Sequence, residues 1–181
     1  MTGRLLDSCR QTLRGWLAPT PDQDRLRRRY LDHLQDHPDG WSRSCPGAHL
    51  TASSLICAAD GQVLLTLHRR IGRWLQTGGH LEAVDDSIEQ AAFREASEES
   101  GLVDLELDHD PLLLSEHEVP CGIVRPTFHL DVQFLIRSES ATAPVVGAES
   151  LAVQWFRHDQ LPEVDDSVSA LVHRAAIRLG W

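Results

Sequence analysis

The segment REASEESGL, residues Arg94–Leu102, places three glutamates close together on one predicted helix. Glu95 and Glu99 are one helical turn apart and Glu98 adjoins both, so the three carboxylates share one patch. Like charges at these spacings repel, at a cost of about 0.2–0.5 kcal/mol for each exposed pair. The patch is therefore either an ordinary solvated acidic face or a binding site for a cation.

The residues around this segment predict where the helix begins, ends and packs. Ser87 suits the N-cap, with Gln90 three residues on, and Gly101 stands where a left-handed residue commonly ends a helix. The predicted buried stripe consists of Ile88, Ala91, Ala92 and Ala96. The three glutamate carboxylates suit Mg²⁺ or Mn²⁺. These hard cations hold substrate phosphates and activate water.

A longer segment, GGHLEAVDDSIEQAAFREASEESGL at residues 78–102, resembles the signature of the Nudix hydrolase family, of which MutT-like proteins are members. That signature is written G-x5-E-x7-R-E-U-x-E-E-x-G-U, where U is a bulky apolar residue. Gly79 matches its leading glycine, and residues 94–102 match its second half at every charged and glycine position. Ala96 is smaller than the usual apolar residue, whereas Leu102 fits.

The loop between the glycines and the helix departs from the signature by one residue. Asp85 occupies the place of the signature's first glutamate, and eight residues rather than seven separate it from Arg94. Glu82 and Asp86 compete with Asp85 for the supporting role of that glutamate.

The resemblance implies a fold, a reaction and a cofactor. The implied fold is an α/β (α+β) domain of the Nudix type, an α/β/α sandwich with a mixed sheet, over roughly residues 45–178. The implied reaction is hydrolysis of the pyrophosphate bond of a nucleoside diphosphate linked to another moiety, with Mg²⁺ or Mn²⁺ as the cofactor. The competing hypothesis is a Nudix-like module that binds a nucleotide without hydrolysing it.

The resemblance also implies roles for individual residues. Glu95 and Glu99 are expected to bind the metal, and Glu98 to be either a third ligand or the catalytic group that deprotonates water. The backbone carbonyl of Gly79 is expected to be a further ligand. Arg94 is expected to orient the glutamates through a charge-assisted hydrogen bond rather than to contact substrate.

One more catalytic acid is expected from a loop beyond the signature, as in many members of the family. Glu149, just before a predicted strand, is the first candidate. Glu116, Glu118 and Asp131 are the alternatives, and a loop carboxylate in solvent is the competing interpretation of Glu149.

Substrate contacts are predicted just before the diglycine. Arg69 and Arg70, together with Arg73, carry charges that suit phosphates, and the Trp74 ring suits stacking on a base. Solvated surface charge and core packing are the competing interpretations of these side chains.

The first 44 residues are predicted to form a helical N-terminal extension, and residues 45–181 the Nudix domain. Residues 5–17 suit one short helix. The order Thr20-Pro21-Asp22-Gln23 is that of a capping box, and Leu26, Tyr30 and Leu34 follow at helical spacing.

From residue 48 the pattern changes to strands mixed with helices, which favours a layered α/β domain with a partly antiparallel sheet. Extended segments are predicted at residues 49–58, 62–67, 74–81, 127–136 and 151–156, with a hairpin turn at 59–61. A final helix is predicted from Asp165 to Gly180.

Composition restricts the class of protein. The 181 residues suit one compact domain, and the formal net charge of −10 argues against binding of nucleic acid or anionic membranes through basic surface. No run approaches the ~18 apolar residues that cross a bilayer. The four cysteines, including Cys121, lie far apart and form no CxxC pair, and residues 1–17 carry polar or charged side chains throughout, unlike a signal peptide, so a reduced cytoplasmic protein is expected. The expected partner is a small nucleoside diphosphate derivative, and a homodimer is left open.

Ten histidines raise the question of a zinc site. His33 and His37 have helical spacing but lack the glutamate of an HExxH motif, and the others are scattered singly along the sequence. Surface and packing roles are therefore the favoured interpretation of the histidines.

Overall fold

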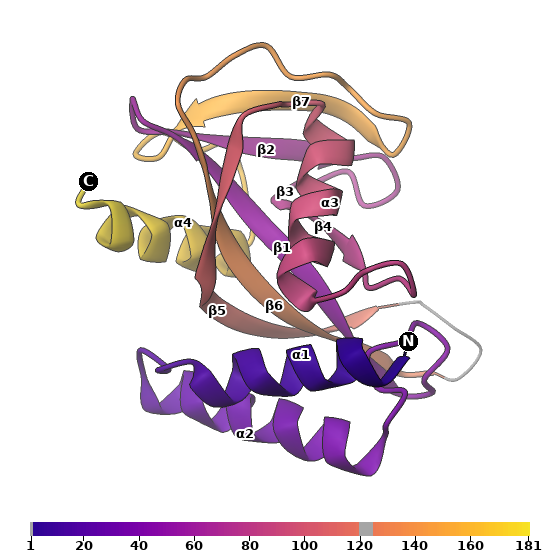
Figure 1. Cartoon of the computed structure of the whole chain (residues 1–181). Coiled ribbons are helices and arrows are strands. Elements are labelled where there is room, and N and C mark those ends of the chain that lie inside the picture. Colours follow the sequence, from indigo (N-terminus) through magenta and orange to yellow (C-terminus); the bar gives the residue numbers. More distant parts are fainter. Residues whose placement is uncertain (1, 120–124) are drawn as a thin grey trace.

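The computed structural model describes residues 2–119 and 125–181, which place a seven-stranded sheet between helices on both faces (Figure 1). The helices are α1 (Thr2–Gly15), α2 (Pro21–Asp36), α3 (Ile88–Ser100) and α4 (Asp166–Leu179). The strands are β1 (Ala48–Ala58), β2 (Gln62–His68), β3 (Trp74–Leu75), β4 (Thr77–His80), β5 (Leu105–Val119), β6 (Thr127–Ser138) and β7 (Ser150–Arg157). The predicted α/β/α sandwich is thereby confirmed.

The sheet is mixed, and β1 lies at its centre. The strand order is β3-β2-β1-β6-β5, while β4 also pairs with β1 and β7 with β2. β1 and β6 run parallel over their whole length, from Ala48 opposite Phe128 to Ala58 opposite Ser138. The other pairs are antiparallel, including the predicted hairpin of β1 and β2.

Alternate residues of β1 face different layers of the molecule. Leu50 and Ala52 belong to an apolar cluster with α1, α2 and α3, whereas Leu55 packs with α4. On the same face as Leu55, the earlier residues Thr51 and Ser53 are buried and polar. One half of the α4 face of the sheet is therefore apolar and the other half carries buried polar side chains.

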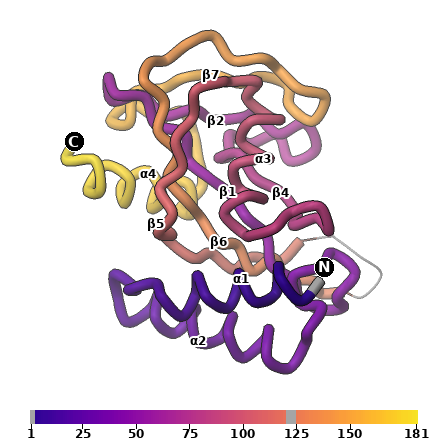
Figure 2. The backbone as a smooth tube through the Cα atoms, viewed as in Figure 1, coloured from indigo at the N-terminus to yellow at the C-terminus, as the bar shows by residue number. Residues whose placement is uncertain are grey.

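The N-terminal helices share the core of the rest of the chain. α1 and α2 lie side by side at one end of the sheet (Figure 2). As predicted, the Thr20 hydroxyl caps α2 by accepting a hydrogen bond from the Gln23 N–H, with Pro21 in the first turn. Tyr30 and Leu34 are fully buried in the cluster that also holds α3 and the sheet.

β5 is a long edge strand that the sequence did not predict. Its register against β6 shifts between Asp108 and Leu113, around Pro111. Proline has no N–H to donate to a ladder, so the interruption breaks the alternating pattern by which a strand is recognised. The edge position accommodates the proline because, among the described residues, β5 pairs with β6 on one side and has no strand on the other, so a missing N–H there breaks no second ladder.

Cys9, Cys45 and Cys57 are buried free thiols. The fourth cysteine, Cys121, lies outside the described residues, and the reduced state of the protein stays a prediction. Within the described ranges, no helix combines the length and the apolar character that a bilayer span requires.

Replacement of Leu34 tests whether the N-terminal helices belong to the core. Leu34→Ala removes a fully buried side chain and is expected to lower the free energy of unfolding by about 2–5 kcal/mol. The neighbouring Gln35 is exposed, so Gln35→Ala is expected to change it by less than about 0.5 kcal/mol. Urea unfolding of both variants makes the comparison, and equal stabilities would show that α2 is not part of the cooperative core.

Candidate functional site

α3 begins and ends where the sequence predicts. The Ser87 hydroxyl accepts a hydrogen bond from the Gln90 N–H at 3.1 Å, and Gly101 ends the helix with a φ of 64°. The predicted stripe is fully buried and consists of Ile88, Ala91, Ala92 and Ala96. This packing fixes the direction in which the glutamates leave the helix.

Arg94 is the centre of an ion-pair network at this helix. Its guanidinium makes two 3.0 Å contacts with Asp85, from Nε to Oδ1 and from Nη2 to Oδ2. Nη1 donates to Glu95 Oε1 at 2.8 Å and reaches Glu98 Oε2 at 3.4 Å, while Nη2 donates to the His80 carbonyl at 3.1 Å. The hydrogen bonds to Asp85 are the main cause that raises the pKa of Arg94. The guanidinium therefore stays charged and holds several elements together.

Of the three residues that compete for the supporting role in the sequence, Asp85 is the one that contacts Arg94. Its carboxylate is buried, and besides Arg94 it accepts a hydrogen bond from the Glu82 N–H at 2.7 Å. The side chains of Glu82 and Asp86 are exposed, and Asp86 pairs with Arg4 at 3.1 Å. The longer loop thus brings Asp85, rather than its neighbours, against the arginine.

The diglycine of β4 lies directly against two of the glutamates. The Gly78 N–H donates to Glu99 Oε2 at 3.1 Å. A Cβ added at Gly79 would lie 2.5 Å from the Glu95 carboxylate, so only a glycine leaves that carboxylate in place. The backbone of Gly79 and the carboxylates of Glu95 and Glu99 are therefore brought to one place.

Burial and mutual repulsion make these carboxylates reluctant to ionise. Burial raises the pKa of Glu99 to about 7; the Gly78 N–H opposes this shift, and the charges of Glu95, Glu149 and Glu98 add to it. Burial also raises the pKa of Glu95, despite the adjacent guanidinium. Such a concentration of partly desolvated negative charge favours the binding of a cation.

The donor set fits a hard divalent ion such as Mg²⁺ or Mn²⁺. The side chains of Glu95 and Glu99 and the carbonyl of Gly79 offer oxygen atoms, which are the ligands these ions prefer. The glycine at position 79 keeps open the space that a side chain would fill. Glu98 is more exposed, with 61% of its side chain in solvent, so it suits contact with water or an outer ligand position.

The loop that carries Glu149 is held near the end of α3. Glu149 lies close enough to Glu99 to raise its pKa. The Arg69 N–H donates to the Glu149 carbonyl at 2.9 Å, and the Arg69 guanidinium donates to the carbonyls of Ala148 and Ser150 at 3.0 and 3.1 Å. Arg69, predicted to contact substrate, therefore holds this loop in position.

The other predicted substrate residues differ in their surroundings. Trp74 packs edge-on against Phe156, with ring centroids 4.9 Å apart. It also lines a cleft of about 530 Å³ together with Arg73 and Glu163. Arg70 is exposed. The contact with Phe156 thus supports the packing interpretation of Trp74, while another part of the Trp74 side chain lines the cleft.

The alternative acids beyond the signature have other partners. Glu116 forms an ion pair with Arg29 of α2 at 2.5 Å. Asp131 is buried and accepts hydrogen bonds from the hydroxyls of Thr51 and Ser53. Glu118 is exposed on β5. Of the four acids considered, Glu149 is the one whose charge raises the pKa of Glu99.

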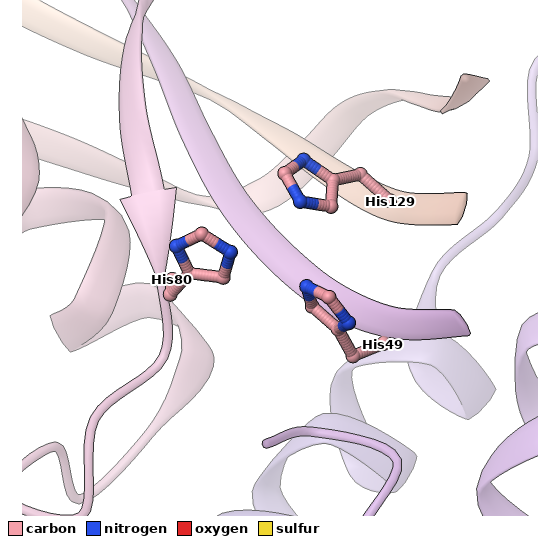
Figure 3. Close-up of side chains that lie close together, drawn as sticks. All are labelled: His49, His80 and His129. Atoms are coloured by element: carbon pink, nitrogen blue, oxygen red, sulfur yellow. The ribbon is translucent and has the colours of Figure 1, made fainter. Parts of the chain in front are cut away.

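Three histidines that the sequence shows as scattered meet on the sheet: His49 of β1, His80 of β4 and His129 of β6 (Figure 3). Sequence reasoning missed the group because the contact depends on which strands pair and in what register. His33 and His37, which have helical spacing, lie with their ring centroids 4.9 Å apart.

Comparisons with known proteins agree on one family. The family model of the NUDIX domain matches residues 47–175. An Ap4A hydrolase of C. elegans is 17% identical, covering 73% of this chain and 98% of that chain at a TM-score of 0.58. The E. coli dihydroneopterin triphosphate pyrophosphohydrolase is 20% identical, covering 71% and 95% at a TM-score of 0.58. The NUDIX domain of Shewanella oneidensis NrtR, complexed with ADP ribose, is 20% identical, covering 82% and 97% at a TM-score of 0.57. No curated protein matches in sequence. These structural likenesses establish the fold.

Replacement of Gly79 tests the position of the Glu95 carboxylate. The methyl group of Gly79→Ala would displace that flexible carboxylate, so the affinity for Mn²⁺ is expected to fall by about 10-fold or more. Gly15→Ala is the control, because no atom lies within 4 Å of a Cβ added there. Calorimetric titration with Mn²⁺ measures both variants, and an unchanged affinity in Gly79→Ala would contradict the assignment.

The raised pKa of Glu99 predicts a pH-dependent stability of the metal-free protein. Between its ordinary value of 4.5 and about 7, the folded chain binds more protons at Glu99 than the unfolded chain does. The free energy of unfolding should therefore fall as pH rises through this window, and Glu99→Gln should remove that part of the slope. Urea unfolding in chelator at pH 5, 6, 7 and 8 tests the sign, and identical slopes for the two proteins would contradict it.

Proposed function

Because this chain belongs to the NUDIX domain family, we propose that it hydrolyses the pyrophosphate bond of a nucleoside diphosphate linked to another moiety. The observation that carries the proposal is the convergence of Glu95 and Glu99 on the diglycine, braced by Arg94 and Asp85. A solvated acidic face would not need an arginine paired with the buried Asp85 or a glycine against a carboxylate. This arrangement favours a cation site over an ordinary acidic surface.

The cofactor proposed is Mg²⁺ or Mn²⁺, held by Glu95, Glu99 and the Gly79 carbonyl, with Glu98 as a further ligand. When bound, such an ion neutralises phosphate charge and lowers the pKa of a coordinated water. Arg94 positions the Glu95 carboxylate through the 2.8 Å hydrogen bond and opposes the rise in its pKa that burial causes.

Hydrolysis requires a group that accepts a proton. A water oxygen forms a bond to one phosphorus, the bridging phosphorus–oxygen bond breaks, and the proton of the water passes to a carboxylate. Glu98 and Glu149 are the candidates for this role, because both are exposed beside the more buried Glu99.

The proposed substrate class rests on the phosphate chemistry. Ap4A, dihydroneopterin triphosphate and ADP ribose, which appear in the names of the three fold relatives, all contain a phosphoanhydride. Arg70 and Trp74 remain the proposed contacts for the rest of the substrate, and the cleft beside Trp74 and Arg73 is the proposed place for it.

A panel of nucleotides, nucleotide sugars, dinucleoside polyphosphates and CoA esters tests the reaction. With Mg²⁺ or Mn²⁺, at least one compound should be cleaved at its pyrophosphate, as shown by product identification. Calorimetric binding of a nucleotide without turnover would instead favour the non-hydrolysing module.

A single substitution tests the proposed ligand. Glu99→Gln is nearly isosteric but loses the negative charge, so turnover should fall by on the order of 100-fold or more, about 2.7 kcal/mol in activation free energy. The matched control is Glu106→Gln, at an exposed position on β5, which should keep the wild-type rate. Initial rates on the best substrate of the panel make the comparison, and wild-type turnover in Glu99→Gln would remove Glu99 from the metal site.

A further inference from the structure

His49, His80 and His129 form a second group of potential metal ligands, apart from the glutamates of α3. Their rings project from β1, β4 and β6 into one common space (Figure 3). His49 is directly opposite His129 in the parallel pair, and His80 is opposite Thr51, two residues along β1 and on the same face. One ring nitrogen from each histidine lies within 4.8 Å of the others.

The spacing of the rings suits coordination of one ion. The ring centroids are 5.2 Å apart for His49 and His80, 4.9 Å for His49 and His129, and 5.0 Å for His80 and His129. With Zn–N bonds of about 2.1 Å and tetrahedral angles, three bound imidazoles have centroids about 5 Å apart. The centroid spacing of the three rings therefore matches that of three imidazoles on one ion, and the ring nitrogens lie within 4.8 Å of one another.

Two of these rings carry nitrogens that lack partners. His49 is fully buried and its ring approaches the Cys45 backbone, yet neither ring nitrogen makes a hydrogen bond of normal geometry among the described residues, and the same holds for Nε2 of His129. A buried polar atom left without a partner destabilises the folded chain. A bound cation would give His49 and His129 one partner each.

The protonation state of the rings also suits a metal. Burial lowers the pKa of His49, and burial together with the neighbouring histidines lowers the pKa of His129 to about 3. Both rings are therefore neutral at pH 7 and keep the lone pair that binds a metal. Arg43 adds positive charge near the rings, but its side chain is exposed, so solvent weakens its effect.

We propose that His49, His80 and His129 bind a zinc-class transition-metal ion at a site separate from the acidic one. Imidazole nitrogens suit Zn²⁺ and related transition-metal ions, whereas carboxylate and carbonyl oxygens suit Mg²⁺ or Mn²⁺. The two sites are connected through the backbone, because His80 follows Gly79 and its carbonyl accepts the hydrogen bond from Arg94 Nη2. A metal at the histidines would brace the strand that carries the diglycine.

Packing of neutral rings is the competing explanation, since aromatic pairs also adopt centroid distances of about 4.5–7 Å. A second group, His37, Asp39 and Cys45, offers another place for a transition metal and must be distinguished. The Cys45 sulfur provides the distinction, because a thiolate bound to cobalt produces charge-transfer absorption in the near ultraviolet and imidazole does not.

Cobalt spectroscopy of the full-length, metal-stripped protein tests the proposal. Addition of one equivalent of Co²⁺ in excess Mg²⁺ should produce the strong visible bands of four- or five-coordinate Co²⁺, and one equivalent of Zn²⁺ should abolish them. His129→Gln should weaken Zn²⁺ binding on the order of 100-fold, since loss of even an outer-sphere contact costs about 10–100-fold. His173→Gln on α4 is the matched control, because His173 is exposed, and it should keep the bands.

Glu99→Gln should also keep the bands, since Glu99 belongs to the other site. The proposal is overturned if wild-type protein shows no such bands, if they persist in His129→Gln, if they disappear in Glu99→Gln, or if thiolate charge transfer accompanies them. X-ray absorption of the zinc-loaded wild type decides the matter without any variant. Scattering from three imidazoles supports the site, and a shell of oxygen or sulfur ligands refutes it.

Discussion

The paired contacts between Arg94 and Asp85 are the interaction on which the site depends. A buried carboxylate needs a partner, and the guanidinium fork satisfies both oxygens of Asp85 at 3.0 Å. The same guanidinium reaches Glu95 and the His80 carbonyl, so one side chain joins α3, β4 and the loop between them. Without it, the carboxylates of Asp85 and Glu95 and the carbonyl of His80 would each lose a hydrogen bond in a partly buried place.

The charge on α3 has opposite consequences for stability and for binding. Burial disfavours ionisation of Glu99, and neighbouring glutamates add to that effect. The fold tolerates this because the apolar stripe of the helix packs tightly and Ser87 and Gly101 satisfy its ends. The stable scaffold thus holds the carboxylates in an arrangement that is electrostatically unfavourable without a cation. A preorganised site differs from a flexible one in this way, because its ligands do not have to move when the ion binds.

Local patterns predicted most of this structure, and long-range pairing accounts for what they missed. Each of the correctly predicted features depends on residues that are close together in the sequence. These features are the caps of α2 and α3, the β1–β2 hairpin and the buried stripe of α3. β5 was not predicted because Pro111 interrupts the alternation of apolar and polar residues and the register against β6 shifts around it. The sequence leaves Glu82, Asp85 and Asp86 as candidates for the supporting role, because loop length alone does not determine which side chain turns inward. The folded loop places Asp85 against Arg94. The histidine group required the parallel pairing of His49 with His129, 80 positions away in the chain, and no local pattern encodes such a register.

The chemistry of β1 differs between its two faces although both are buried. Leu50 and Ala52 contact the apolar layer, while Thr51 and Ser53 donate hydrogen bonds to Asp131 on the other side. A slip of β1 by one residue against β6 would exchange the two sets, placing hydroxyls in hydrocarbon and leucine against a carboxylate. A misaligned pairing is therefore unfavourable on both faces of β1, so the sequence of this strand specifies one register against β6.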